Sequence, residues 1–225
     1  MDDLSSISGV MQAGTFQDLS PQIKTALFIS AMTFLSSLLV TMTAFTRIVI
    51  VLSFVRRALS TQEIPPTQVI IGLSLFLTFF VMGPTFQNIE QQALAPYLNE
   101  TIDGGESLLR ASTEMKSFML RQTRKQDLML FIEMSGETSL ESPSVTPLRI
   151  LIPAFIISEL KTAFIMGFCL YLPFILIDLV VSVILMALGM MMMPPVVIST
   201  PCKILLFILV DGWSLIARAL SLSFS

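Results

Sequence analysis

The chain has 225 residues, of which 54% are hydrophobic and 13% are charged, and its mean hydropathy is +0.82. An ordinary soluble domain of this size does not carry so much apolar surface, so the composition predicts a membrane protein. The net charge of −3 does not indicate a basic surface that would bind nucleic acid. The absence of histidine excludes His-ligated metals, Ser-His or Cys-His nucleophiles and His proton relays.

The charged residues are segregated along the chain. Residues 87–147 contain nine Asp or Glu and five Lys or Arg, and long apolar stretches lie on both sides. We therefore expect a polar N-terminal tail at 1–20, a first apolar helical half at 21–86, a polar helical insert at 87–147 and a second apolar helical half at 148–225. The tail lacks the features of a signal peptide, so we expect the first apolar segment to act as its own insertion signal.

The first apolar half opens with a long helical stretch. Ser20 followed by Pro21 is typical of a helix start, and Thr25–Thr46 would be about 33 Å long as a helix, enough to cross a bilayer core. Continued past Arg47 to Val55, the helix would be about 46 Å long. We therefore expect it to tilt, break or stand partly outside lipid.

A turn at Ser60–Pro66 leads to a second helix, Thr67–Met82, which we expect to end at Gly83-Pro84. The pair Arg56-Arg57 lies just before this turn. The positive-inside rule therefore predicts that the turn is cytoplasmic and that the N-terminus and the polar insert are extracytoplasmic.

The polar insert predicts one amphipathic helix and one loop. Apolar residues recur at helical spacing between Glu106 and Lys125, at Leu108, Met115, Phe118 and Met119. Such an apolar face needs a partner. The Ser-, Thr-, Glu- and Pro-rich segment Ser135–Pro147 predicts a loop.

The second apolar half begins at Leu148 and is interrupted several times. We expect a segment Ile150–Ile177 with Glu159, Lys161 and Pro173 inside it, a segment Leu179–Met193 after Asp178, and a last helix at Lys203–Leu222. The two cysteines, Cys169 and Cys202, lack metal-ligand spacing, and we expect both to be buried thiols.

The segment Gly189–Pro195 reads Gly, four Met, Pro, Pro. Four consecutive methionines cannot share one helix face, because successive residues are turned about 100° apart. The prolines Pro194 and Pro195 remove backbone donors and clash with a continuing turn, so we expect a break that presents flexible thioethers. The alternative is a Met-rich core or lipid-facing segment that ends at a proline kink.

Six ionisable residues lie within or at the edge of apolar runs, and each would cost roughly 2.5 to 3.5 kcal/mol near a bilayer centre. They are Arg47, Glu159, Lys161, Asp178, Lys203 and Asp211. These charges cannot pair along their own helices. Glu159 and Lys161 are two residues apart, and Lys203 and Asp211 are eight apart, so neither spacing brings the opposite charges together. The charges must meet across helices, across subunits or in water. A self-satisfied bundle interior is one interpretation; inter-subunit contacts in an oligomer are the other, which we favour.

Two rival classes use charges inside membranes. Asp178 and Asp211 could form the shared-proton pair of an aspartyl intramembrane protease, but neither lies in the Gly-x-Gly-Asp context of such enzymes. A secondary transporter also has broken helices and intramembrane charges, although no internal repeat is visible here.

Five stretches in order resemble the FliP family, core membrane subunits of the flagellar type III protein-export gate. They are Met42–Phe54, Gly72–Met82, Ile157–Phe164, Leu188–Met192 with Pro194-Pro195, and Lys203–Trp213. The injectisome relatives are also similar over the last stretch but usually lack an unbroken Met run before Pro-Pro. The resemblance therefore favours the flagellar branch, with an injectisome gate subunit as the alternative.

The resemblance implies a non-enzymatic role without cofactors. About five copies would assemble with FliQ and FliR into a conical helical channel in the bacterial inner membrane, within the flagellar basal body. Unfolded export substrates would pass through it, and the FlhA and FlhB export components would be further partners.

The resemblance also assigns residues. The family's methionine gasket, which closes the resting channel, falls on Met190, Met191 and Met192, and Met193 extends it; Gly189, Pro194 and Pro195 make the break. The family's intermolecular salt bridge would fall on Glu159 and Lys203. We add Lys161, Asp211 and Arg47 as candidate inter-subunit charges. Two departures are Cys202, where the family more often has Phe, and a start without the signal peptide that many relatives carry.

Overall fold

The structure is a computed structural model that describes residues 20–61, 64–136, 146–190 and 192–224. Within these residues every regular element is helical, so the prediction of an all-α, membrane-associated fold is confirmed. In chain order the elements are α2 (Pro21–Thr41), α3 (Phe45–Ala58), α4 (Thr67–Val81), α5 (Gly83–Ile89), the π-helical turn η2 (Glu90–Leu94), α6 (Ala95–Leu98), α7 (Gly104–Gln122), α8 (Lys125–Ser135), α9 (Leu148–Ala187), α10 (Val196–Leu209) and α11 (Gly212–Leu222).

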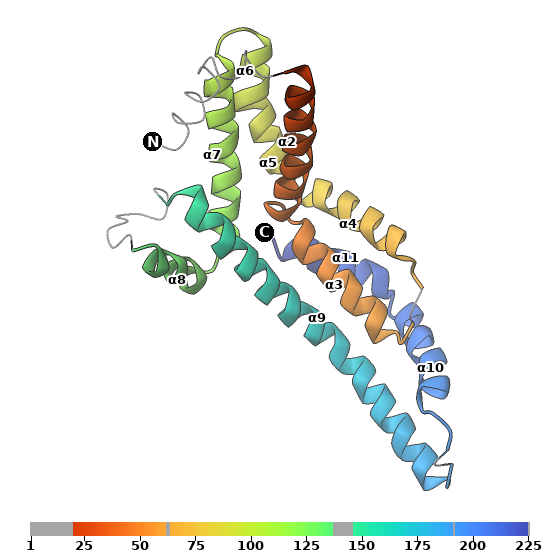
Figure 1. Ribbon diagram of the computed structural model, residues 1–225. Coiled ribbons are helices and arrows are strands. Elements are labelled where there is room, and N and C mark those ends of the chain that lie inside the picture. Colours follow the sequence, from red (N-terminus) through yellow and green to blue (C-terminus); the bar gives the residue numbers. More distant parts are fainter. Residues whose placement is uncertain (1–19, 62–63, 137–145, 191, 225) are drawn as a thin grey trace.

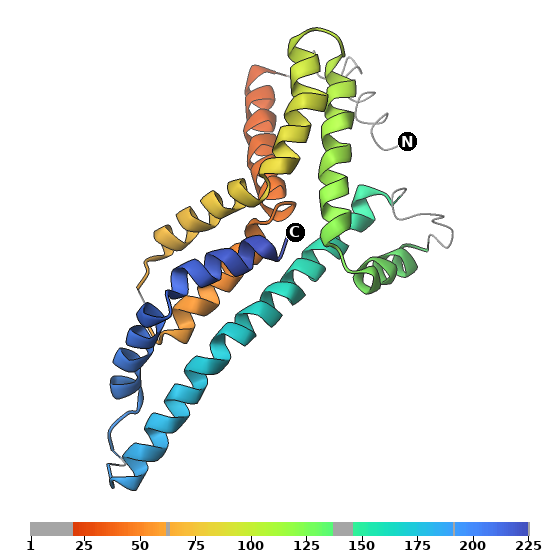
Figure 2. The same cartoon turned by 180° about the vertical axis from the view of Figure 1, so that it is seen from behind.

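The helices form an elongated molecule along α9 (Figure 1). At one end α2, the α5–α6 segment and α7 gather, with α8 beside the start of α9. At the other end α9 and α10 form a hairpin, and α3, α4 and α11 lie between the two ends (Figure 2). The C-terminus lies near the middle of the molecule, where α11 returns toward α7 and α9.

The first apolar half breaks where its length requires it. Helix α2 begins at Pro21, as predicted, and ends at Thr41; α3 then starts at Phe45 and brings Arg47 into the interior. Helix α4 ends at Val81, with Met82 as its C-cap, so the expected end at Gly83-Pro84 is confirmed. The chain bends by 59° there and continues as α5, because Pro84 lies in the first turn of the new helix, where its missing N–H does no harm.

The predicted amphipathic helix of the insert is α7. Asp103 caps it, and its Oδ1 accepts from the Glu106 N–H at 2.8 Å. Phe118 and Met119 are buried as expected, but Leu108 is 60% exposed, so the apolar face covers only the C-terminal half of the helix. Most of the predicted loop, residues 137–145, lies outside the described residues.

The second half differs most from the sequence prediction. Helix α9 runs for 40 residues through Pro173 and Asp178, both of which were expected to interrupt it. The predicted last helix is two helices: α10 begins earlier, at Val196, and the chain turns by 65° before α11. Asp211 occupies this bend with φ 50°, a left-handed conformation that Asp tolerates better than most residues.

The core lies where α3 crosses the first half of α9. Ile48, Val51 and Leu52 of α3 pack with Leu151 and Phe155 of α9, and all five are buried. Phe118 and Met119 of α7 and Ile216 and Leu220 of α11 complete this core. The packing therefore concentrates at the centre of the molecule and thins toward the α9–α10 end.

Within the described residues, α9 is long and apolar enough to cross a membrane. The bent pairs α4 with α5–α6, and α10 with α11, would qualify if each were one broken span. Cys169 and Cys202 are exposed, contrary to the expected burial, because they lie on faces of α9 and α10 that the single chain leaves uncovered.

Candidate functional site

The methionine loop, residues 189–195, closes the α9–α10 hairpin. Helix α9 ends in a Schellman motif: the Met190 N–H donates to the Leu185 carbonyl and the Gly189 N–H to the Met186 carbonyl, each at 3.0 Å. Gly189 has φ 77°, the left-handed conformation that glycine adopts without strain. The sequence therefore ends α9 at a defined point, as the glycine and the prolines predicted.

The side chains of this loop project from the molecule. Met192 is 99% exposed, and Met190 and Met193 are also exposed, while Met191 lies outside the described residues. On the other side of the loop, Pro195 directly precedes α10, and its carbonyl accepts from the Ser199 N–H at 2.9 Å. The loop connects α9 to α10 at the far end of the hairpin (Figure 1), and its described methionines are exposed there.

Two ion pairs, each with a buried basic side chain, connect the long helix α9 to other helices. The first, which we name the junction pair, joins Arg47 of α3 to Glu159 of α9: Nε and Nη2 donate to the two carboxylate oxygens at 2.8 and 2.5 Å. Glu159 is 0% exposed and Arg47 only 2%. This bidentate geometry suits the planar guanidinium.

The remaining donors of Arg47 are also satisfied. Nη1 donates to the carbonyl and to the hydroxyl of Ser223 at 2.8 and 3.0 Å, and Nη2 donates to Gln122 Oε1 at 3.1 Å. The ring of Phe224 lies 3.8 Å from the guanidinium carbon, and Gln122 donates to the Phe224 carbonyl. All five N–H groups of the guanidinium thus have acceptors, on α7, α9 and the end of the chain.

The second pair, which we name the tip pair, joins Lys203 of α10 to Asp178 of α9. Lys203 Nζ lies 2.5 Å from Asp178 Oδ2 and donates to Ser60 Oγ at 2.6 Å. Ser199 donates to the other carboxylate oxygen of Asp178 at 2.5 Å. Lys203 and Ser199 are buried, whereas the side chain of Asp178 keeps 35% of its surface exposed.

Within this chain, Glu159 and Lys203 have partners other than each other. Both charges are buried and bound by Arg47 and Asp178 of the same chain, and their pairing with each other between subunits stays a prediction. Arg47 is likewise internal. Lys161 and Asp211 are exposed, and their predicted inter-subunit role stays a prediction.

Sequence reasoning missed the role of Asp178. Its signal was present, because charges within apolar helices must meet partners across helices, but one sequence does not show which helices face each other. The contacts also remove the basis for a protease: both oxygens of Asp178 bind Lys203 and Ser199, so it is not poised to share a proton with Asp211.

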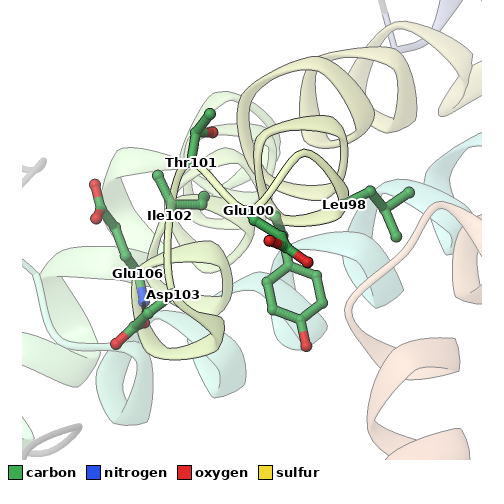
Figure 3. A pocket seen from close by; sticks show the side chains of 7 residues that line it. Leu98, Glu100, Thr101, Ile102, Asp103 and Glu106 are labelled. Carbon is green, nitrogen blue, oxygen red and sulfur yellow. Dashed lines mark hydrogen bonds between the residues drawn. The ribbon is translucent and has the colours of Figure 1, made fainter.

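An open hollow of about 570 Å³ lies at the turn between α6 and α7 (Figure 3). Asp103 and Glu106 lie on one side of this turn and Leu98 on the other. Asp103 is occupied as a helix cap and Glu106 binds Arg110 at 2.6 Å, so these acids serve local structure rather than a common ligand.

Comparison with known proteins agrees with the residue patterns. A family model described as the FliP family matches residues 28–220. The chain is 50% identical over 208 residues to flagellar biosynthetic protein FliP of Bacillus subtilis strain 168, covering 92% of this chain and 94% of that protein. It is 46% identical over 209 residues to the protein of the same name from Aquifex aeolicus, with 92% and 87% covered. For that of Buchnera aphidicola from Acyrthosiphon pisum, identity is 48% over 209 residues, with 93% and 55% covered.

Proposed function

The chain belongs to the FliP family and is a membrane-associated component of the flagellar export apparatus, and on that basis we propose that it is a channel-forming subunit of the export gate. Several copies would surround a path for unfolded flagellar proteins across the inner membrane. The methionine loops of these copies would meet to seal the path at rest. The proposal needs no catalytic group, because sealing and conduction are properties of packing.

The uncovered surface of α9 carries this proposal. Its most apolar stretch is only 11% buried within the chain, and its exposed side chains include Phe164, Phe168 and Leu172. At 1.5 Å per residue the helix is about 60 Å long, roughly twice the thickness of a bilayer's hydrocarbon core. Lipid alone therefore cannot cover the whole helix, and other protein chains are the natural cover for the remainder.

The chemistry of the loop suits a deformable seal. Methionine is unbranched and has three rotatable bonds, so a ring of such side chains can close against ions and part around a polypeptide without fixed hydrogen bonds. A hydrophobic constriction also opposes ion flow by excluding water. The exposure of Met190, Met192 and Met193 at the end of the hairpin supports this role, because the loops of several copies could meet there.

The same proposal includes an orientation. The turn after Arg56 and Arg57 lies toward the α9–α10 end of the molecule, and α7 lies at the opposite end (Figure 2). If basic loops face the cytoplasm, the methionine loop lies toward the cytoplasmic entrance, and the insert, residues 87–147, is extracytoplasmic. The boundaries 1–20, 21–86 and 148–225 then separate the tail and the two apolar halves.

Partners follow from the family and from the exposed charges. We propose FliQ and FliR as companion subunits, about five copies of this chain per gate, and FlhA and FlhB as further export components. Lys161 and Asp211 are among the exposed charges of the mainly apolar segments, and we assign these two to contacts with neighbouring subunits. A small transporter, the rival class, would instead purify as a monomer or small homo-oligomer.

The test replaces Met190, Met191 and Met192 together by alanine in the complete gate. We expect the particle to keep its mass and subunit content but to leak small ions in the absence of substrate, because alanine cannot fill the constriction. The matched control replaces Met129 and Met134, exposed methionines of α8 outside the hairpin, and should stay sealed. An assembled triple variant with unchanged permeability would remove the gasket from the proposal.

A further inference from the structure

The α9–α10 hairpin has a short contact surface. Helix α10 buries three residues, Ser199, Lys203 and Phe207, which are four apart and therefore share one face. Across from them, the ring of Phe207 lies 6.4 Å from that of Phe174 on α9, and Lys203 and Ser199 bind Asp178 one turn further along. Two of the three buried positions on α10 are thus polar.

Little else holds the hairpin beyond Asp178. From there to its end, α9 buries only Leu185, whose carbonyl accepts from Met190 at the start of the loop. Asp178 is also the one Asp, Glu, Lys or Arg between 162 and 188, and Lys203 is the one between 189 and 210. The tip pair is therefore the only charged contact between the described residues of α9 and α10 near the methionine loop.

A third segment takes part. Lys203 Nζ also donates to Ser60 Oγ in the turn that follows α3, where Ser60 has φ 57°. The ammonium thus connects α10 to both α9 and the end of α3. We name Asp178, Ser199, Lys203 and Ser60 the tip latch.

We propose that the tip latch positions the methionine loop: it fixes α10 against α9 at about seven helical turns' distance from the central core, so that the loops of neighbouring copies meet in register. This inference rests on the proposed channel function and adds Asp178, Ser199 and Lys203 as positioning residues for the seal. An ion pair with excellent geometry specifies one relative placement of two helices, whereas apolar faces slide over each other more easily.

The key variant is Asp178→Asn, which keeps the shape of the side chain and removes its charge. We expect the gate to assemble with wild-type mass but to leak ions as the triple methionine variant does, because the loops lose their register. Asp178→Glu restores the charge and should recover most of the seal. Rescue by a carboxylate distinguishes loss of the latch from general loss of packing.

A milder variant guards against loss of folding. Ser199→Ala removes one hydrogen bond and keeps the ion pair, so it should assemble and leak less than Asp178→Asn. Its matched control is Thr200→Val on the same turn, because the Thr200 hydroxyl is exposed and bonds its own helix at the Val196 carbonyl. We expect Thr200→Val to stay sealed.

A second measurement reports the loop itself. In a Cys169→Ser, Cys202→Ser background, Met192→Cys gives a single thiol in the loop, and its rate of maleimide labelling in the assembled gate reports its surroundings. The latch predicts that adding Asp178→Asn, or Ser199→Ala where the former does not assemble, changes this rate, while Thr200→Val does not.

The outcomes separate the two ideas. Assembled latch variants with wild-type permeability and wild-type labelling overturn the positioning role, and the channel proposal survives if the triple methionine variant leaks. A triple methionine variant that stays sealed overturns the gasket instead, and the labelling rate alone then decides whether the latch positions the loop.

Discussion

The two ends of α9 are built in different ways. Near its start, the helix packs into the central core, and the junction pair there is fully buried, with all five guanidinium donors of Arg47 bonded. Near its end, the helix buries almost no apolar side chain, and the tip pair keeps part of Asp178 in contact with its surroundings. Helix α9 thus connects a core that is packed within the chain to a hairpin whose apolar side chains are mostly exposed.

The difference shows which contacts of α9 are complete within a single chain and which part of the helix remains available to other molecules. A planar arginine fork held by partners on several segments fixes orientation as well as distance, so the junction is complete within one chain. A lysine is a point charge on a flexible stem, and its two contacts, with Asp178 and Ser60, fix the hairpin with less precision. Apolar surface beyond it remains available to neighbouring copies or to lipid.

The sharpest way to break this comparison is to remove one carboxylate at each end. Glu159→Gln leaves Arg47 buried without a counter-ion, and we expect a loss of about 3–5 kcal/mol in the free energy of unfolding. Asp178→Asn should lose less, about 1–3 kcal/mol, because the site is partly exposed and Ser60 still binds Lys203. Thermal unfolding of the purified protein in detergent measures both.

The control for this pair is Arg47→Lys, which keeps the charge but replaces the five-donor fork by three donors. It should remain clearly less stable than the wild type, because Lys cannot reach Glu159, Gln122 and Ser223 together. Equal losses for Glu159→Gln and Asp178→Asn would show that the two ends do not differ as described.

The sequence predicted some helix boundaries correctly but not the continuity of α9. The break after Thr41, the amphipathic α7 and the end of α9 at Gly189 follow from local rules on length, periodicity and glycine. The continuity of α9 through Pro173 does not, because packing against other helices outweighs a local proline penalty.

The charge partners show the same limit. Sequence reasoning recognised that Glu159 and Lys203 needed opposite charges across helices, and the family resemblance implied that they pair with each other between subunits, which stays a prediction. Their partners within the chain, Arg47 and Asp178, lie 112 and 25 residues away, and only the fold brings them within bonding distance. A single sequence states which charges need neutralising and leaves their pairing open.

A second prediction tests how much the end of the chain contributes to the junction. A chain ending at Leu222 removes both Ser223 acceptors and the Phe224 ring from Arg47. We expect it to lose about 2–3 kcal/mol of stability, since two donors of a buried charge become unsatisfied. The measurement is the same unfolding experiment, combined with Glu159→Gln in a double-mutant cycle.

The control is Leu222→Ser, a change at an exposed residue of the same turn that leaves Ser223 and Phe224 in place. It should be close to neutral. Because truncation and Glu159→Gln act on one guanidinium, their losses should not add. Fully additive losses would show that the end of the chain stabilises something other than the junction pair.

The smallest expected effect concerns the stretch between the two ends, where α3 and α9 approach closely at Gly167. A Cβ added there would lie 2.6 Å from ring atoms of Phe54, so Gly167→Ala must displace a ring that also packs edge-on against Phe164. We expect a loss of about 1 kcal/mol, because the phenyl side chain can shift but the packing suffers. Gly72→Ala in α4 is the matched control: an added Cβ meets no atom within 4 Å, and helix propensity predicts a gain of up to about 1 kcal/mol. A loss of stability at Gly167 together with a gain at Gly72 would show that the packed part of α9 extends beyond Gly167, toward the tip pair. If both substitutions change the stability in the same direction, the packed interior ends before Gly167. The uncovered part of α9 would then be longer than the burial of its residues indicates.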